Sequence, residues 1–305
     1  MKIKEEIFRE MNVIRMENEY LVMLVCPEDG MNIYSIEYKG QPIVVFDDER
    51  QKEGRTFSVP ILYPTPNRIE NGKFLWAEKE YQGVMHGCTK NANFRVVQMT
   101  VKDNQIILEA QLDWKKGTEY YSVFPFDSIL SIRIILDKEQ IHYKYTVENL
   151  DEKELPYGFA VHPFFVIEDN ETSFIVNADS VMEMNEEQLP TGSLIAVQNT
   201  KYDLHKETSV ASHRLDHVYT SLSSKPMAKV RYRHCTMELN ASEVFTHMVV
   251  FTPNDKFFCL ENQTCSTDSH NLFNKGFVKE SGLQIVQPKK KESGEIIFSF
   301  CSIEA

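Results

Sequence analysis

The stretch QIILEAQLDW, Gln105 to Trp114, alternates apolar and polar residues over its whole length. The apolar set consists of Ile106, Leu108, Ala110, Leu112 and Trp114, and the alternate, mostly polar set of Ile107, Glu109, Gln111 and Asp113. Successive side chains of a β-strand point to opposite faces of its sheet, so a period of two places the apolar set in a core. The stretch therefore predicts an antiparallel strand with one buried face.

The same period recurs along the chain. In IHYKYTVENL, 141–150, the apolar side chains again occupy alternate positions, and the polar DKEQ before it predicts a hairpin with SILSIRIIL, 128–136. The segments MNIYSIEYKGQPIVVF, AKVRYRHCTMEL, HMVVFTPNDKFFCLE and SGEIIFSFCSIE follow the same pattern. Helix signals are few: we expect a turn or two in SVMEMNEEQ, 180–188, and after Pro66. The pattern predicts an all-β protein, a large antiparallel β-sandwich.

Composition bounds the organisation of the chain. Its 305 residues, 42% hydrophobic and 26% charged, are typical of an ordinary globular protein. No linker rich in Pro, Gly or Ser divides it, so we expect a single domain, 1–305.

Charge and cysteine content indicate the setting. A net charge of −12 and a pI near 5.3 argue against nucleic acid or an anionic membrane as partner and favour a small molecule. The first twenty residues are charged throughout and lack an apolar core, so we expect neither a signal peptide nor an anchor, and a cytoplasmic location. Six scattered cysteines without a CxxC spacing predict reduced thiols and no zinc site.

Several common chemistries would leave motifs that are missing here: G-x-G-x-x-G, G-x-x-x-x-G-K-[ST], G-x-S-x-G and H-E-x-x-H. Instead, polar residues stand in apolar or turn contexts. They occur in PNRIENGKF, 66–74; VMHGC, 84–88; VHPFF, 161–165; RLDHVYT, 214–220; and CLENQT, 259–264.

In this order the motifs resemble those of the aldose 1-epimerase, or galactose mutarotase-like, family. They are Asn67-Arg68-Ile69 with Gly72-Lys73-Phe74, His86-Gly87, His162-Pro163-Phe164-Phe165, Asp216-His217 and Leu260-Glu261. The resemblance covers nearly the whole chain and implies the galactose mutarotase-like supersandwich. It departs from the family at Phe164, where Tyr is usual, at Cys88, and at Ser266-Thr267, where Pro is frequent. These departures leave the ring-opening groups in place and leave the sugar preference open.

The resemblance also implies roles. Exchanging the anomers of a sugar requires a base for the C1 hydroxyl proton and an acid for the ring oxygen, tasks that a carboxylate and a histidine can share. Glu261 would be the catalytic base and His162 the catalytic acid. Asn67, Arg68, His86 and Asp216 would bind the substrate, with no metal or organic cofactor.

Each of these residues also has a plainer interpretation. His162 alone could be a core histidine, His86 a turn residue, and Arg68 and Asp216 surface charges. Glu261 stands out because it follows the apolar FFCL, and an unpaired buried carboxylate is costly. Histidines in TDSHN, 267–271, and at 213 and 217 match no metal-site spacing, so we expect a solvated loop at TDSHN.

Three functions remain open. We expect a mutarotase acting on a free hexose such as galactose or glucose, as a monomer or homodimer. One alternative is a hexose-6-phosphate 1-epimerase with a phosphate pocket drawn from Arg55, Lys90, Arg95 and Arg214. Another is a non-catalytic carbohydrate-binding module, which would not need both His162 and Glu261. Free sugars are favoured because no compact cluster of Arg and Lys accompanies the motifs.

Overall fold

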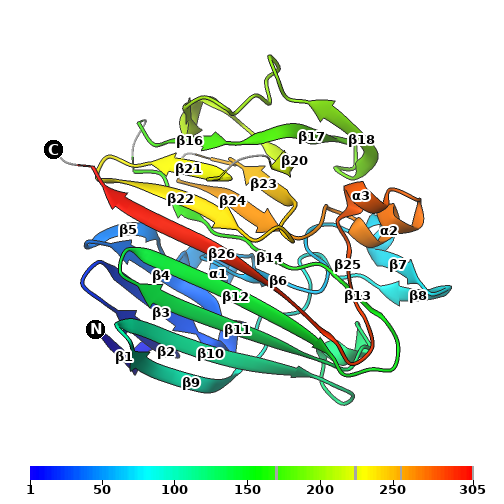
Figure 1. Ribbon diagram of the computed structural model, residues 1–305, viewed down its shortest axis with the longest axis horizontal. Helices are drawn as coiled ribbons and strands as arrows, with labels where there is room; N and C mark the ends of the chain where they lie inside the picture. Colours follow the sequence, from blue (N-terminus) through cyan, green and yellow to red (C-terminus); the bar gives the residue numbers. More distant parts are fainter. Residues whose placement is uncertain (169–170, 223–224, 255, 304–305) are drawn as a thin grey trace.

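Two large antiparallel sheets packed face to face dominate the computed structural model, which describes residues 1–168, 171–222, 225–254 and 256–303 (Figure 1). Strands β9–β12 and β26 lie on one side of the molecule in this view, with the N-terminal strands β1–β5 behind them. The predicted all-β class is confirmed.

The described residues form two main sheets. The thirteen-stranded sheet contains β1 (Lys2–Phe8), β2 (Met11–Glu17), β3 (Leu21–Cys26), β4 (Asn32–Tyr38), β5 (Gln41–Val44), β6 (Ile61–Leu62), β14 (Ala160–Val161), β15 (Phe165–Val166), β17 (Ala178–Met184), β18 (Pro190–Ala196), β20 (Asp216–Leu222), β23 (His247–Phe251) and β24 (Phe257–Gln263). The nine-stranded sheet contains β9 (Arg95–Lys102), β10 (Gln105–Trp114), β11 (Ser128–Asp137), β12 (Gln140–Asn149), β16 (Ser173–Val176), β19 (Thr208–Ser209), β21 (Ala228–Arg231), β22 (Cys235–Ala241) and β26 (Lys291–Ser302).

Smaller elements complete the described structure. Two-stranded sheets join β7 (Lys73–Trp76) to β8 (Lys79–Gln82) and β13 (Leu155–Tyr157) to β25 (Gln284–Val286). The helices are α1 (Asp48–Lys52), α2 (Ser269–Asn274) and α3 (Val278–Ser281), with 3₁₀ turns η1 (Pro27–Asp29), η2 (Glu70–Gly72), η3 (Tyr120–Ser122) and η4 (Val210–Ser212). No helix in the described part of the chain is long and apolar enough to cross a membrane.

The alternating stretch 105–114 forms β10, and all five of its predicted core side chains are buried. β10 pairs with β9 and β11, and β11 turns back into β12 with Asp137 opposite Gln140, which confirms the predicted hairpin.

Aromatic rings join the two sheets across the core. Tyr38 of β4 stacks on Phe300 of β26 with ring centroids 5.1 Å apart, and Phe174 of β16 stacks on Phe258 of β24 at 5.9 Å. All four rings are buried, and removing each such side chain from water stabilises a fold by about 1.5–3 kcal/mol. The inward face of β24 is thereby fixed against the core.

The predicted helical turn in SVMEMNEEQ is wrong, whereas the turn after Pro66 is present as η2. Residues 180–184 belong to β17, which lies between β18 and β20. Val181 and Met182 point to opposite faces of that strand, and both are buried. Because both faces of the strand are buried at these two adjacent positions, the alternation is lost there, which explains the error.

The predicted solvated loop at TDSHN is also wrong. Asp268 is buried at the start of α2, together with Ser269 and His270. The Asp268 carboxylate accepts hydrogen bonds from the backbone N–H of Glu70 and the side-chain amide of Asn271. α2 and η2 are thereby tied together, and polar composition alone did not reveal that contact.

All six cysteines are free thiols, as predicted. Burial raises the pKa of Cys235 to about 12 and that of Cys265 to about 11, so these two thiols are held in their unreactive protonated form.

Candidate active site

A cavity of about 490 Å³ opens on the outer face of the thirteen-stranded sheet, within the range of about 300–1,000 Å³ typical of small-molecule sites. All six residues predicted for the site line it: Asn67, Arg68, His86, His162, Asp216 and Glu261. Strand order accounts for part of this convergence. β20, β23 and β24 are neighbours, so Asp216 lies opposite Phe251 and Val249 opposite Glu261.

Glu261 reaches the cavity because β24 alternates strictly. Phe258 and Leu260 point into the core between the sheets, whereas Cys259, Glu261 and Gln263 occupy the other face. The run FFCLENQ is buried on both faces, and this places a carboxylate inside an apolar segment.

His162 lies in a break between two short strands, β14 and β15. Its backbone N–H donates to the carbonyl of Pro60 at 3.0 Å, and that of Phe164 donates to the carbonyl of Ser58 at 2.8 Å. Pro163, between them, has no N–H to donate. The His162 ring stacks on the Phe164 ring with centroids 4.5 Å apart and planes 9° from parallel. Backbone and ring contacts thus hold the imidazole in one place.

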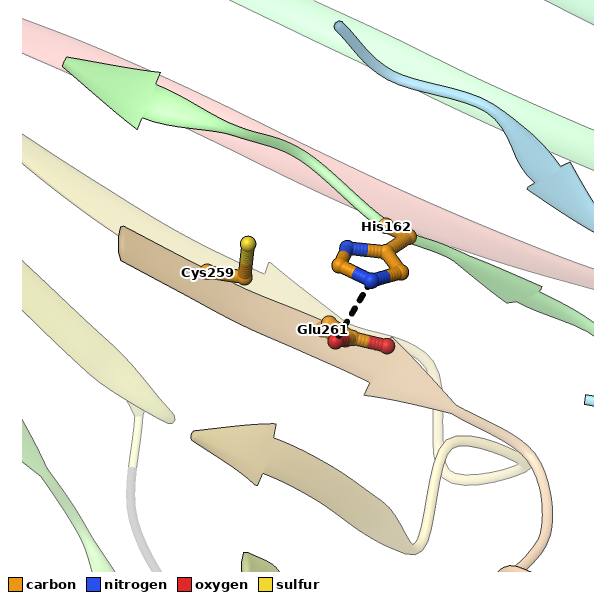
Figure 2. Close-up of side chains that lie close together, drawn as sticks. All are labelled: His162, Cys259 and Glu261. Carbon is orange, nitrogen blue, oxygen red and sulfur yellow. Dashed lines mark ion pairs between the residues drawn. The ribbon is translucent and has the colours of Figure 1, made fainter. Parts of the chain in front are cut away.

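The two predicted catalytic side chains meet. Nε2 of His162 lies 3.3 Å from Oε1 of Glu261, and both groups are buried (Figure 2). Burial raises the pKa of Glu261 well above its ordinary value. Burial, and then the charges of His86 and Arg50, lower the pKa of His162 well below its own. These opposite shifts favour a protonated Glu261 and a neutral His162, so the pair holds one proton.

A chain of amides orients the carboxylate. Nε2 of Gln263 donates to Oε2 of Glu261 at 2.9 Å, and Nδ2 of Asn67 donates to Oε1 of Gln263 at 2.9 Å. Asn67 adopts a left-handed φ of 61°, which asparagine tolerates better than most residues. Sequence reasoning missed Gln263, although its position two residues after Glu261 places both on one face of a strand.

The His86-Gly87 turn brings a second histidine to the cavity. Gly87 has a φ of 78°, and a Cβ there would lie 2.1 Å from the carbonyl oxygen of Tyr63, so this position needs glycine. The centroids of the His86 and His162 rings lie 5.7 Å apart. Burial, and then Arg68, lower the pKa of His86 to about 4. Its Nδ1 is buried and finds no hydrogen-bond partner within the described residues, as expected of a group that awaits a ligand.

Arg68 and Asp216 form an ion pair at the open side of the cavity. Nη2 of Arg68 lies 3.3 Å from Oδ2 of Asp216, and the two side chains are 38% and 39% exposed. Both are thus partly exposed charges, as their plainer interpretation has it, although Asp216 begins strand β20 rather than lying in a loop. Because both also line the cavity, each can exchange this partner for a ligand hydroxyl.

Three further cations line the same cavity: Arg50, Arg55 and Lys90. Two of them were among the four candidates for a phosphate pocket, whereas Arg95 and Arg214 are not among the described lining residues. No compact cationic cluster accompanies the motifs in the sequence, but in the fold these three cations line one cavity. Residues far apart in sequence meet in the fold, and Arg50 carried no sequence signal.

Within the described chain, one group of potential metal ligands lies close together: His162, Cys259 and Glu261, with ligand atoms within 4.8 Å of one another (Figure 2). A metal needs the thiolate and the carboxylate. Burial instead raises the pKa of both Cys259 and Glu261 well above their ordinary values, which favours the protonated forms. The donor set is suitable in kind, and binding a cation there would require the release of both protons.

The fold and cavity define the class first: a β-sandwich protein with a buried histidine–carboxylate pair lining a cavity of about 490 Å³. The chain belongs to the aldose 1-epimerase family, whose model matches residues 12–299. The resemblance seen in the motifs is confirmed.

Solved structures share the fold along almost the entire chain. A galactose mutarotase-like protein from Clostridium acetobutylicum is 22% identical, with 99% of each chain covered and a TM-score of 0.90. A galactose 1-epimerase from Lactobacillus acidophilus is 14% identical, with 99% of this chain and 98% of that chain covered and a TM-score of 0.80. A putative aldose 1-epimerase from Escherichia coli K12 is 16% identical, with 95% and 99% covered and a TM-score of 0.78. The galactose mutarotase-like fold is thus confirmed.

Proposed function

We propose that this protein interconverts the α and β anomers of an aldohexose by acid–base opening and closing of the sugar ring. The single observation that carries the proposal is the buried contact of His162 and Glu261, 3.3 Å apart, in a cavity large enough for a monosaccharide. Family membership supports the same activity.

The reaction needs one proton removed and one supplied. Glu261 takes the proton from the C1 hydroxyl while His162 gives a proton to the ring oxygen, and the bond between C1 and that oxygen breaks to leave a free aldehyde. Rotation about the C1–C2 bond exposes the other face of the carbonyl. The steps then reverse: the C5 hydroxyl returns its proton to His162, and Glu261 protonates the new C1 oxygen.

The shared proton explains why the pair is buried. Burial alone favours protonated Glu261 and neutral His162. Moving that proton to His162 creates the working base and acid without bringing net charge into the cavity. The Gln263 amide stabilises the resulting carboxylate, and the imidazolium lies beside it. In a site with little water, a small change in the position of the sugar can therefore move the proton from Glu261 to His162.

The remaining residues would hold the sugar. Arg68 and the unpartnered Nδ1 of His86 would bond to ring oxygen or hydroxyls, and Asp216 would accept from hydroxyls. Asn67 was expected to bind substrate directly, but its amide hydrogen bonds to Gln263. We therefore propose that Asn67 acts mainly by holding the Gln263–Glu261 chain in place.

A non-catalytic sugar-binding module is the alternative from another class. Sugar hydroxyls can be bound by exposed polar groups, so binding alone gives no reason to bury two titratable groups against each other. Their burial supports the enzyme.

The test is catalysed anomerisation. Fresh α-anomers of glucose, galactose and their charged derivatives would be followed by polarimetry or one-dimensional NMR, with spontaneous exchange in the same buffer as baseline. We expect acceleration with at least one sugar, and its loss in Glu261→Gln. Binding of every sugar without acceleration of any would leave the binding module as the correct interpretation.

We further propose the setting expected from the sequence: one domain over 1–305, working in the cytoplasm as a monomer or homodimer, on a small sugar and without metal or organic cofactor. The six free thiols support a reducing environment.

A further inference from the structure

We propose that the substrate is an aldohexose with an anionic group on C6, and that Arg50, Arg55 and Lys90 bind this group. The proposal rests on the proposed function, because it uses the position of the ring oxygen relative to His162. It replaces the uncharged hexose that the sequence favoured. These three residues are named the rim.

The rim is one connected structure. Arg50 belongs to α1, and the backbone N–H of Arg55 donates to the carbonyl of Arg50 at 2.9 Å. Nζ of Lys90 donates to the carbonyl of Gly54, next to Arg55. A short helix, the loop after it and a distant turn thus place three cations around one side of the cavity.

Of the three residues, Arg50 gives the strongest support for an anion site. Its guanidinium lies 4.6 Å from the centroid of the Phe164 ring and 5.1 Å from that of Phe257, and its Nε donates to the carbonyl of Thr56 at 2.6 Å. Among the described residues, its guanidinium forms no ion pair within 4.0 Å; the Asp47 carboxylate bonds to its backbone N–H instead. Burial, and then the charge of Arg55, lower the pKa of Arg50. A half-buried cation facing a cavity without an acidic partner is a site for a ligand anion.

The charge balance of the cavity supports the same conclusion. Its described lining contains four Arg and Lys side chains and two carboxylates, although the chain as a whole carries −12. Arg68 already pairs with Asp216, and burial favours the protonated, neutral form of Glu261. Arg55 pairs at 2.5 Å with Glu53, but both are about half exposed, and such surface pairs are weak. The rim charge therefore stays largely available to a ligand.

The span between His162 and the rim is compatible with an anion on C6. His162 acts on the ring oxygen, and C5, bonded to that oxygen, carries C6. His162 and Arg50 both pack on the Phe164 ring. The centroid of that ring lies 4.5 Å from the centroid of the His162 imidazole and 4.6 Å from the Arg50 guanidinium carbon, so the imidazole and the guanidinium are at most about 9 Å apart. A pyranose with its ring oxygen at His162 can direct its C6 substituent toward Arg50 over such a span. An anionic group on C1 would block the hydroxyl that must lose its proton.

Phosphate and carboxylate are the two sources of such an anion. A phosphate offers three oxygens and can contact all three rim residues, whereas a carboxylate fits the planar fork of one arginine. The shared prediction is that a charge on C6 improves the substrate.

The experiment compares kcat/KM for anomer exchange, measured by saturation-transfer NMR, between charged and neutral partners. Glucose 6-phosphate and glucuronate would be compared with glucose, and galactose 6-phosphate and galacturonate with galactose. We expect at least a ten-fold preference for one charged member of a series. Arg55→Gln and Lys90→Gln, at exposed positions where folding is not at risk, should each lower that preference about ten-fold.

Arg50→Gln should lower the preference further, and Arg50→Lys less, because lysine keeps the charge but not the fork. The matched control is Arg95→Gln, which removes one exposed cation on β9, outside the described lining of the cavity, and should leave the preference unchanged.

The outcomes separate the two proposals. Equal or better turnover of neutral sugars, or an equal fall in Arg95→Gln and the rim variants, would overturn the anion site and leave the epimerase standing. No acceleration with any sugar, charged or neutral, would overturn the epimerase itself.

Discussion

The floor and the rim of the cavity are built by different means. The floor, defined as Asn67, His162 and Glu261, is buried. Glu261 lies on β24, and His162 lies between β14 and β15, which both pair with β24. The rim lies on a five-residue helix, a loop and a turn, and two of its three residues are exposed. Rigid elements suit groups that must meet within hydrogen-bond distance, whereas loops suit contacts that differ between substrates. We infer that the floor supplies chemistry and the rim supplies specificity.

The largest expected effect comes from substituting the two titratable residues of the floor. Glu261→Gln keeps the shape but not the basicity, and His162→Asn removes the proton donor, so each should lower kcat by about 10²–10⁴-fold. The double variant should be scarcely worse than the poorer single one, because the two groups act in one step.

The measurement is exchange NMR with the spontaneous rate subtracted, and Glu187→Gln, at an exposed turn, is the control. Substantial kcat in Glu261→Gln would show that the base lies elsewhere and that the floor is not the site of chemistry.

The second prediction concerns pH. The working pair holds one proton. The pKa of His162 is lowered, so the pair should bind a second proton only below the ordinary histidine value of 6.5. The pKa of Glu261 is raised, so the pair should lose its single proton only above the ordinary glutamate value of 4.5. kcat should therefore fall on the acid side only below pH 6.5 and on the basic side only above pH 4.5, with limits that belong to the pair.

Gln263→Met sharpens this prediction by removing the amide that stabilises the carboxylate. The pKa of Glu261 should rise further, so the basic limb should move to higher pH while kcat falls about ten-fold and KM changes little. A fall in kcat with the limb unmoved would mean that Gln263 acts only through packing.

Sequence reasoning was more successful for the floor than for the rim, and the reason is physical. Period-two alternation sets which face of a strand is buried, so QIILEAQLDW predicted β10, and a carboxylate inside FFCLENQ indicated a site. Arg50, by contrast, is one charged residue in a charged segment, DDERQKEGR. Only the fold brings it over Phe164 and Phe257, and no local pattern encodes that contact.

The third prediction lies between floor and rim. Asp216 is partly exposed and pairs with Arg68, so it belongs to neither region. Asp216→Asn should raise KM about ten-fold and lower kcat less than three-fold, because replacing a charged acceptor for a sugar hydroxyl by a neutral one weakens binding of ground state and transition state alike. Steady-state kinetics on the best substrate would measure both, with Asp103→Asn in an exposed turn as control. A drop confined to kcat would mean that Asp216 takes part in the chemistry, as the floor residues do.

The smallest expected effect is measured on the unchanged protein, because salt should affect binding at the rim but not the chemistry at the floor. The rim is open to solvent, so its attraction for an anionic sugar is screened as the Debye length falls from about 10 Å at 0.1 M salt to about 3 Å at 1 M. The contact between His162 and Glu261 is buried, and screening there is much weaker. Raising the salt concentration should therefore increase KM for the charged sugar several-fold and leave its kcat unchanged, while neither constant changes for the neutral sugar of the same series. Sodium chloride titrations of both sugars, followed by exchange NMR at constant pH, make the measurement. If kcat falls with salt for both sugars, the floor is exposed to ions during turnover, and the division of labour between floor and rim does not hold.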